Sequence, residues 1–319
     1  MPETLEQYRA QFVESKKAAG IEYKWQTQLL KKFLTVAAPY LTEDCALPKA
    51  AVLAWNSRRG NECPKTRQQR VNTVRAFAEY LAARGIPAYV SPILHEGGSN
   101  YVPHIFSNNE LARLFHAIDN RPNVTRMGNW YIMPIIFRTL YACGLRRSEA
   151  VNLRVRDVDL DTGVLTILET KFHKDRLVPV HEKLLVQLRD YAEKMLIARN
   201  PDAPFFPKST GEFYESSALY TVFRKCLWDA GISHGGKSEG PRVHDLRHTF
   251  AVHCLRKWVL AGDDITAVLP YLSAYLGHTH FRHSQVYLRL TADMYPDIAT
   301  KMEALFDVFP AREGYHEAD

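Results

Sequence analysis

Four short stretches of this 319-residue sequence carry side chains whose types suit chemistry on an anion. They are GLRRSE with Arg146, TKFHKDR with Lys171, HDLRHTF with His244 and Arg247, and LGH with His278, followed nine residues later by Tyr287. Guanidinium groups are permanent cations that bind oxyanions through paired N–H donors, and histidine can hold or pass a proton near neutral pH. Each stretch alone also fits an ordinary surface or packing role. A site for a phosphate or another oxyanion is therefore one reading of each stretch.

Local signals indicate which elements would hold these side chains. Gly144 ends one helix and another begins near Ser148, which leaves Arg146 at a tight corner. Residues 164–168 and 176–180 are typical of two strands, and together they predict a hairpin whose turn carries the lysine. The turn could equally be an ordinary solvated loop.

The last two stretches are expected on helices. The histidine and arginine of HDLRHTF are three residues apart and share a helix face. Gly277 ends a helix with an apolar stripe, and Tyr287 lies on the next short helix. His244 and His248 have a spacing that zinc sites use, but the sequence has no HExxH and Cys254 is not spaced like a ligand. We expect no metal and no cofactor.

In this order, the four stretches resemble the boxes of the tyrosine recombinase family, which includes the phage integrases and Xer-type enzymes. GLRRSE resembles the first-arginine box, TKFHKDRLVPV the hairpin-lysine box, HDLRHTF the His-x-x-Arg box, and LGH with its following tyrosine the final box. The resemblance covers about residues 105–300. It implies a site-specific DNA recombinase or integrase with a mainly α-helical fold and a small β-hairpin or sheet in its catalytic domain.

The resemblance implies a role for each residue of the phosphate pocket. Arg146 and Arg247 would bind the scissile phosphate. His244 would act in proton transfer and phosphate contact, and His278 would complete the pocket. Glu149 would brace the pocket by pairing with an arginine or a histidine. Donors of this kind stabilise charge on the non-bridging oxygens without a metal.

The same resemblance makes Tyr287 the nucleophile, which would form a covalent 3′-phosphotyrosine without ATP. Lys171 would protonate the leaving 5′ oxygen. Lys174 is its rival, because hairpin turns slip in register. The other tyrosines near the boxes do not keep the spacing; they are Tyr271, Tyr275, Tyr295 and Tyr315. His280 and His283 are interpreted as surface histidines.

The length and composition suit about two globular domains, with 46% hydrophobic and 24% charged residues. Apolar spacing predicts four helices, at 3–18, 22–39, 48–58 and 64–84. Three prolines and a Gly-Gly pair within residues 86–104 indicate a linker, and Ser107 to Glu110 form a capping-box pattern that opens a new helix.

These signals divide the chain into a helical core-binding domain at 1–88, a linker at 89–104 and a catalytic domain at 105–319. By the resemblance, the two domains would close on duplex DNA as a C-shaped clamp. Four subunits, as a homotetramer, would hold two DNA sites.

The net charge is +6, and it is unevenly placed. Residues 1–100 hold 14 Lys and Arg against nine Asp and Glu. This surplus favours a first module that faces a polyanion. Arg67, Arg70 and Arg75 fall largely off the buried stripe of their helix, so they are candidate DNA contacts, although a solvated helix face is an equal alternative.

The sequence lacks an apolar run of membrane-spanning length and an apolar signal core. Its five cysteines are scattered and odd in number, as in a reduced, cytosolic protein. We therefore expect a cytoplasmic protein with no membrane association.

Two other functions stay open. They are relaxation of DNA by type IB topoisomerase-like chemistry and DNA binding by a relative that has lost catalysis. A mobile-element integrase is weakly favoured over a chromosome-dimer resolvase, because residues 256–271 lengthen the interval between Arg247 and His278. A last amphipathic helix, expected at 292–306, would pack on its own core or on a neighbouring subunit.

Overall fold

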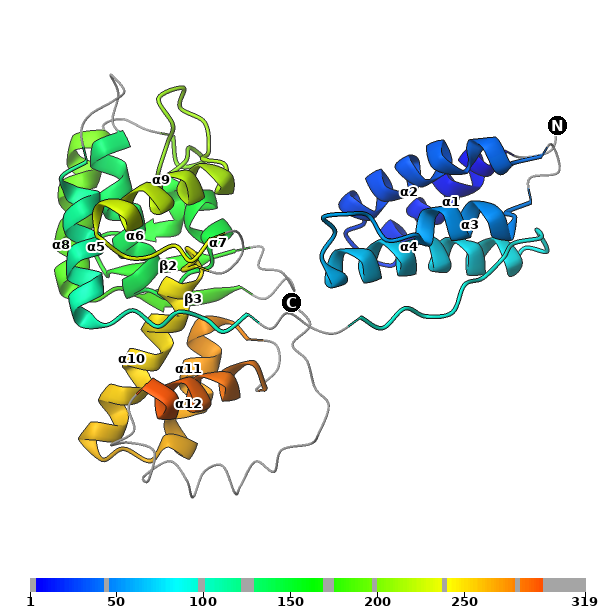
Figure 1. Cartoon of the computed structure of the whole chain (residues 1–319). Helices are drawn as coiled ribbons and strands as arrows, with labels where there is room; N and C mark the ends of the chain where they lie inside the picture. The colour runs from blue at the N-terminus through cyan, green and yellow to red at the C-terminus, as the bar shows by residue number, and fades with distance from the viewer. Residues whose placement is uncertain are drawn as a thin grey trace. The chain divides into compact units, whose positions relative to one another are not determined.

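The computed structural model describes residues 4–42, 46–96, 101–121, 129–168, 175–196, 200–236, 240–278 and 282–294. These residues form two compact units that divide after residue 100 (Figure 1). The described part of the first unit is helical, and the second unit combines helices with a small antiparallel sheet. The predicted fold class is confirmed. In the described ranges, no helix has the length and apolar character needed to cross a membrane.

The first unit is built on helices that the sequence predicts. They are α1 (Leu5–Ala18), α2 (Lys24–Ala37), α3 (Lys49–Asn56) and α4 (Pro64–Ala82), with the 3-10 turn η1 (Ala38–Tyr40) after α2. Thr4 caps α1 in a capping box with Gln7, and a proline occupies the first position of α4. Buried Phe12, Phe33 and Phe77 pack into one apolar core. All four predicted helical stretches are confirmed.

Residues 89–96, which composition assigned to the linker, pack on the first unit. The Tyr89 backbone N–H donates to the Leu47 carbonyl at 2.9 Å. On α4, Asn72 makes two 3.0 Å hydrogen bonds with the Leu94 backbone, and Arg75 donates to the Ser91 carbonyl. These bonds satisfy backbone groups that proline-rich composition alone leaves unassigned.

The larger part of the second unit surrounds an apolar core of helices and sheet. Its helices are α5 (Asn108–Asp119), α6 (Asn129–Ala142), α7 (Arg147–Asn152), α8 (Glu182–Met195) and α9 (Ser216–Asp229), with the 3-10 turn η2 (Val155–Asp157). The predicted capping box at the start of α5 is confirmed by the Ser107 and Glu110 hydrogen bonds. This core therefore supports the corner that precedes α7.

The sheet has the order β1-β2-β3 and is antiparallel throughout. Its strands are β1 (Val158–Asp159), β2 (Val164–Ile167) and β3 (Arg176–Pro179). β2 and β3 confirm the predicted hairpin strands, and Leu165 pairs with Val178 on its buried face. β1 was not predicted, because two residues are too few to show an alternating pattern.

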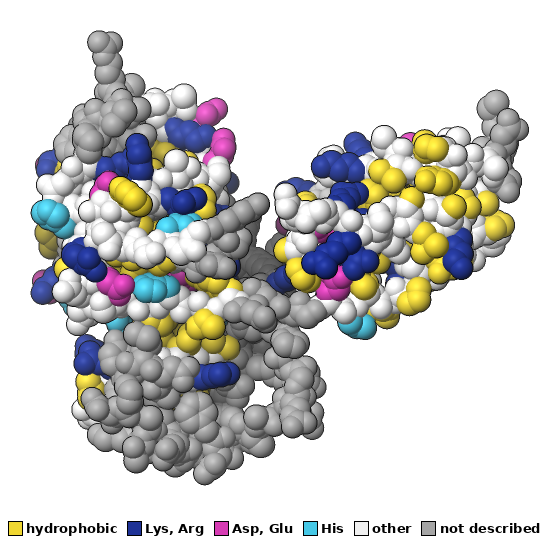
Figure 2. All heavy atoms as spheres, in the orientation of Figure 1, with side chains coloured by type: hydrophobic (Ala, Val, Ile, Leu, Met, Phe, Trp, Pro, Cys, Tyr) yellow, Lys and Arg dark blue, Asp and Glu magenta, His cyan; other side chains and the backbone are white. Residues whose placement is uncertain are grey.

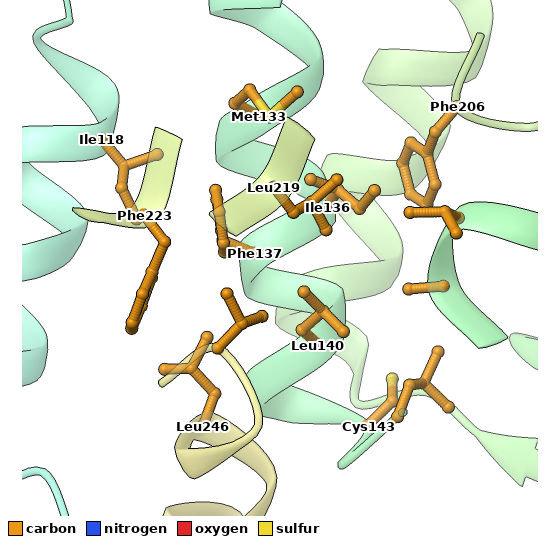
Figure 3. Packing of buried hydrophobic residues seen from close by; sticks show 14 of the residues in the cluster. Ile118, Met133, Ile136, Phe137, Leu140, Cys143, Phe206, Leu219, Phe223 and Leu246 are labelled. Atoms are coloured by element: carbon orange, nitrogen blue, oxygen red, sulfur yellow. The ribbon is translucent and has the colours of Figure 1, made fainter. Parts of the chain in front are cut away.

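Three further helices carry the last two motifs. They are α10 (Asp245–Ala261), α11 (Ile265–Leu276) and α12 (Arg282–Met294), which lie together at one end of the second unit in Figure 1. α10 joins both cores of the unit. Its Leu246 lies with Leu140 and Cys143 in the larger core (Figure 3), and its Leu255 belongs to the core of α10 to α12.

The lengthened segment before LGH extends α10 to Ala261, where Gly262 ends it in a left-handed conformation. Asp264 then caps α11. α12 ends at Met294, so most of the helix predicted at 292–306 lies outside the described residues.

Candidate active site

Arg146 lies at the corner between α6 and α7. The preceding Gly144 has a φ of 56°, and a Cβ atom there would lie 2.6 Å from the Phe250 ring, so the corner requires glycine. The Arg146 backbone N–H donates to Glu149 Oε2 at 2.8 Å, and Nη1 donates to Oε1 at 2.7 Å. Nη2 donates to the Gly277 carbonyl at 3.1 Å. The first motif is thereby joined to the last.

Glu149 is a buried carboxylate that accepts hydrogen bonds from two arginines. Besides Arg146, Arg176 at the start of β3 donates from Nη1 to Oε1 at 2.9 Å and from Nη2 to Oε2 at 2.8 Å. Burial raises the pKa of Glu149, but hydrogen bonding to Arg176 and the charges of Arg176 and Arg247 outweigh it and bring the pKa to about 2. Glu149 is therefore ionised at neutral pH and pairs with arginines, as expected.

Arg176 is a site residue that the sequence analysis did not assign. Its side chain is 8% exposed, and its Nε donates to the Tyr275 carbonyl at 2.8 Å. A Cβ atom at Gly277 would lie 3.0 Å from Arg176 Nη1, so this guanidinium packs against the LGH corner. The one sequence signal that could have pointed to Arg176 is its position at the start of a strand, directly after a charged turn. Its partners lie 27 and 99 residues away, where spacing predicts no pairing.

Arg247 is 1% exposed and is anchored by backbone carbonyls. Nη1 donates to the Gly144 carbonyl at 2.7 Å, and Nη2 donates to the Leu276 carbonyl at 2.5 Å. Its Nη1 stays 3.9 Å from Glu149 Oε2. Burial lowers the pKa of Arg247 to about 10, which leaves the guanidinium charged at neutral pH. The two predicted phosphate-binding arginines therefore share the corners at Gly144 and LGH.

His244 precedes α10 and is an exposed side chain. Crowding by protein atoms lowers the pKa of His244, and the charges of Arg247 and Arg146 lower it further. The ring nevertheless keeps an exposed surface within this crowded neighbourhood. His244 is thus a neutral imidazole at pH 7, able to accept a proton.

His278 and Tyr287 stack on one another. Their ring centroids are 5.8 Å apart with an interplanar angle of 19°, and His278 Nδ1 lies 2.8 Å from Ser284 Oγ. The ring centroid of His248 lies 5.7 Å from that of Tyr287 and 4.8 Å from that of His244. Tyr287 is 2% exposed. The structure therefore brings the predicted nucleophile to the final histidine, in a buried position.

The choice between Lys171 and Lys174 lies outside the described residues, as do Tyr295, Tyr315 and His280 and the His283 side chain. The two rival tyrosines on α11 can be placed. Tyr271 is 74% exposed. Tyr275 stacks on Phe250, and burial raises its pKa strongly.

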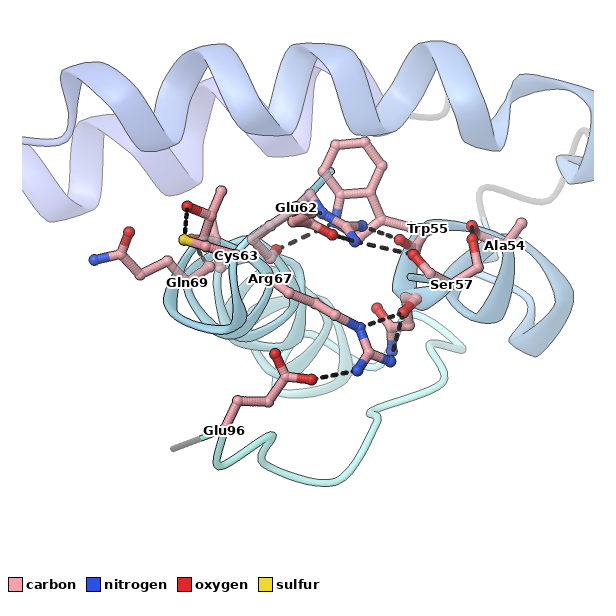
Figure 4. A network of polar contacts seen from close by, with 12 residues as sticks. Ala54, Trp55, Ser57, Glu62, Cys63, Arg67, Gln69 and Glu96 are labelled. Atoms are coloured by element: carbon pink, nitrogen blue, oxygen red, sulfur yellow. Dashed lines mark hydrogen bonds and ion pairs between the residues drawn. The ribbon is translucent and has the colours of Figure 1, made fainter. Parts of the chain in front are cut away.

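The three arginines proposed as DNA contacts are held within the first unit. Arg70 is 1% exposed, pairs with Glu62 and donates to the carbonyls of Trp55 and Ser57. The prediction of a DNA contact is therefore wrong for Arg70, because its donors stabilise the α3–α4 connection. Arg67 donates to the Asn56 carbonyl and pairs with Glu96 (Figure 4).

Arg75 likewise pairs with Glu79 at 2.7 Å, besides its hydrogen bond to the Ser91 carbonyl. A DNA contact by Arg67 or Arg75 stays a prediction. Periodicity separated these arginines from the apolar stripe but could not reveal that carboxylates and carbonyls of the same unit satisfy them.

The site carries an excess of positive charge. The guanidinium groups of Arg146, Arg176 and Arg247 surround the single carboxylate of Glu149, so the cluster has a formal charge of +2 with histidines set aside. Such a cluster stabilises a phosphate group whose negative charge grows during reaction. The buried Tyr287 ring lies beside the rings of two histidines, His248 and His278.

Comparison with known proteins identifies the family of this chain. The model of the phage integrase family matches residues 105–294. A protein of Sinorhizobium fredii named as integrase/recombinase y4rB is 31% identical over 312 residues, covering 94% of this chain and 97% of that protein. Tyrosine recombinase XerA of Pyrococcus furiosus is 28% identical, over 69% of this chain and 68% of its own length.

Solved structures show the same fold at lower identity. XerH site-specific recombinase bound to palindromic difH substrate has a TM-score of 0.61 at 17% identity, covering 88% of this chain and 79% of that chain. The Tn1549 transposon integrase in complex with transposon right end DNA has a TM-score of 0.60 at 16% identity, covering 95% and 99%. The chain belongs to the phage integrase family, and it is a tyrosine site-specific DNA recombinase.

Proposed function

We propose that this recombinase cleaves and rejoins DNA through a covalent 3′-phosphotyrosine at Tyr287. The bond from the phenol oxygen to phosphorus forms as the bond from phosphorus to the 5′ oxygen breaks. The phenol proton passes to a base, and an acid protonates the leaving oxygen. Attack by the 5′ hydroxyl of a partner strand reverses these changes, so exchange needs neither metal nor ATP.

The observation that carries the proposal is the shared anchoring of the two arginines. Arg146 is held by the Gly277 carbonyl and Arg247 by the Leu276 carbonyl, directly before His278, whose ring stacks on Tyr287. Side chains from three motifs thus surround one small region. One well-placed donor to a developing oxyanion typically contributes about 10²–10³ in rate.

His244 and Lys171 supply proton transfer in this proposal. Neutral His244 is suited to accept the phenol proton, and His278 completes the set of phosphate donors. Lys171 is proposed as the acid for the 5′ oxygen. It lies between β2 and β3, in the segment outside the described residues.

Burial of the nucleophile suggests an order of events. Arg247 and Tyr287 are almost fully buried, whereas His244 is exposed and Arg146 is partly exposed. We expect a DNA phosphate to meet Arg146 and His244 first. Tyr287 must be uncovered before it can attack, so DNA binding would precede activation of the phenol.

Assembly follows from the chemistry. A complex of a related integrase is named as a dimer bound to a core site. Exchange between two such sites requires two dimers, so we propose a homotetramer on two duplexes. Closed symmetric assemblies of this kind are common among soluble oligomers.

Exposed cations of the first unit are proposed to hold the duplex backbone. Figure 2 shows Lys and Arg side chains at several places on the visible face of this unit. Arg58 and Arg59, between α3 and α4, are both exposed. Phosphate contacts of this type make DNA affinity fall steeply with salt.

Trapping the covalent intermediate tests the function. Duplexes tiled across the DNA that flanks the gene, each with a nick just beyond a candidate scissile phosphate, would release a short 5′-hydroxyl fragment on cleavage. We expect a detergent-resistant protein–DNA adduct that maps to Tyr287 by mass spectrometry. Tyr287→Phe, the matched control, should bind the same duplex without forming the adduct.

Three outcomes would contradict the proposal in different ways. Binding by the wild type without an adduct would make the chain a non-catalytic DNA-binding relative. An adduct with Tyr287→Phe would refute the nucleophile assignment. Relaxation of supercoiled plasmid without any specific site would favour topoisomerase-like activity.

A further inference from the structure

We propose that Arg176 is a positioning residue that neutralises Glu149, so that Arg146 and Arg247 keep donors for the scissile phosphate. The inference rests on the proposed phosphate-binding function of this pocket. It assigns a role to Arg176, which lies within the hairpin-lysine box but receives no role from the resemblance.

The hydrogen bonds of Glu149 show how Arg176 would act. Oε1 accepts from Arg176 Nη1 and Arg146 Nη1, and Oε2 accepts from Arg176 Nη2 and the Arg146 backbone N–H. A carboxylate has about four lone-pair sites, so these four bonds saturate it. Arg247 stays 3.9 Å from Oε2, beyond hydrogen-bonding distance.

Arg247 is held by neutral backbone carbonyls and not by the Glu149 carboxylate. The hydrogen bonds to the Gly144 and Leu276 carbonyls use two of its five N–H donors. A bidentate bond to a carboxylate is stronger than a bond to a neutral carbonyl. Glu149 would therefore compete with the phosphate for Arg247 if its own acceptor sites were not filled.

Arg176 itself is poorly placed to bind DNA. All three of its guanidinium nitrogens are engaged, Nε with the Tyr275 carbonyl and both Nη atoms with Glu149. The side chain is 8% exposed and packs against Gly277. Its effect on the reaction would thus pass through Glu149 to the two phosphate-binding arginines.

Removal of Arg176 would change both geometry and charge. Each Glu149 oxygen would lose one donor, and the formal charge of the cluster would fall from +2 to +1. Arg247 and the remaining Arg146 donors would then turn toward Glu149. Replacing Glu149 by glutamine as well returns the charge to +2 and removes the competing carboxylate.

The experiment compares Arg176→Met with the double variant Arg176→Met and Glu149→Gln. We expect Arg176→Met to slow single-turnover adduct formation by about 10- to 100-fold, the range of coupling between contacting residues. Its affinity for the duplex should be unchanged. The double variant should regain most of the rate that Arg176→Met loses. The single variant Arg176→Lys should keep more of the wild-type rate than Arg176→Met but less than the double variant, because lysine lacks the bidentate fork.

A matched pair elsewhere in the second unit controls for loss of a salt bridge. Arg138 makes a bidentate pair with Asp119, both bonds at 2.7 Å, and neither residue has a place in the proposed pocket. Arg138→Met, alone and with Asp119→Asn, should leave adduct formation unchanged. Circular dichroism establishes that each variant is folded.

A crystal structure of Arg176→Met supplies a measurement that does not depend on activity. We expect Arg247 Nη1 to move from 3.9 Å to hydrogen-bonding distance of Glu149 Oε2. An unchanged distance, or rate losses that merely add in the double variant, would overturn the role of Arg176. Absence of an adduct with the wild type would instead refute the proposed function, and the structural measurement would still decide the position of Arg247.

Discussion

Replacing Gly144 with alanine tests whether the backbone corner before Arg146 organises the site. The residue has a φ of 56°, a left-handed conformation that costs other L-residues roughly 1–2 kcal/mol. The new Cβ atom would also lie 2.6 Å from Phe250 Cδ1 and 3.0 Å from Leu276 Cδ2. Leu276 is fully buried, and the Phe250 ring is stacked on Tyr275.

Overpacking of this kind costs about 1–3 kcal/mol. The expected loss in the free energy of unfolding is therefore about 2–5 kcal/mol. The Gly144 carbonyl also accepts the 2.7 Å hydrogen bond from Arg247 Nη1, so a displaced corner should slow adduct formation as well.

Urea unfolding followed by circular dichroism measures the loss, with Gly262→Ala as the matched control. Gly262 has a similar positive φ of 84° at the end of α10, but a Cβ atom there meets nothing within 4 Å. The control should lose only the conformational part, roughly 1–2 kcal/mol. Equal losses in the two variants would refute the close approach of Gly144 to Phe250 and Leu276.

Three further outcomes follow from the charged residues. Arg70→Ala should lower the free energy of unfolding by about 3–5 kcal/mol, because it leaves buried Glu62 unpaired. Arg58→Ala should leave the free energy of unfolding unchanged and reduce the salt slope of DNA binding by about 1. The reverse pattern would contradict both assignments. The depressed pKa of Glu149 contributes stability above pH 4.5, about 3 kcal/mol, which should be lost as the pH falls from 4.5 through 2; urea unfolding of Glu149→Gln should lack this dependence. The pKa of His244 is lowered, so its NMR signals should show no protonation at pH 6.5, and half-titration there would contradict the placement of its imidazole.

Local signals account for most of the helices and for the corners that hold the motif residues. The Ser107 and Glu110 capping box, the proline that opens α4 and the glycine that ends α11 each act within one helical turn. Such effects depend on neighbours three or four residues away, so sequence patterns reveal them. β1 lacked such a signal because its pairing with β2 stabilises only two residues.

Tertiary contacts explain why some polar residues differ in the structure from what the sequence predicts. Arg70 has the spacing of a solvated helix face, yet Glu62 and two carbonyls of the α3–α4 connection enclose it. The composition of residues 89–96 indicates a linker, yet Asn72 and Arg75 hold this segment on α4. A residue type alone does not say whether a polar group is satisfied by water or by a distant backbone atom.

The sequence by itself predicted the family, most of the helices and the motif residues of the candidate pocket other than Arg176, because ordered motifs and short-range periodicity are properties of the linear chain. The tertiary structure alone decided how those residues share their charges. It joined Arg146 to Gly277 across 131 residues, paired Arg176 with Glu149, and buried Tyr287 against His278. These pairings are set by which donors and acceptors meet once the two cores of the second unit have packed, and that meeting has no signature in local spacing.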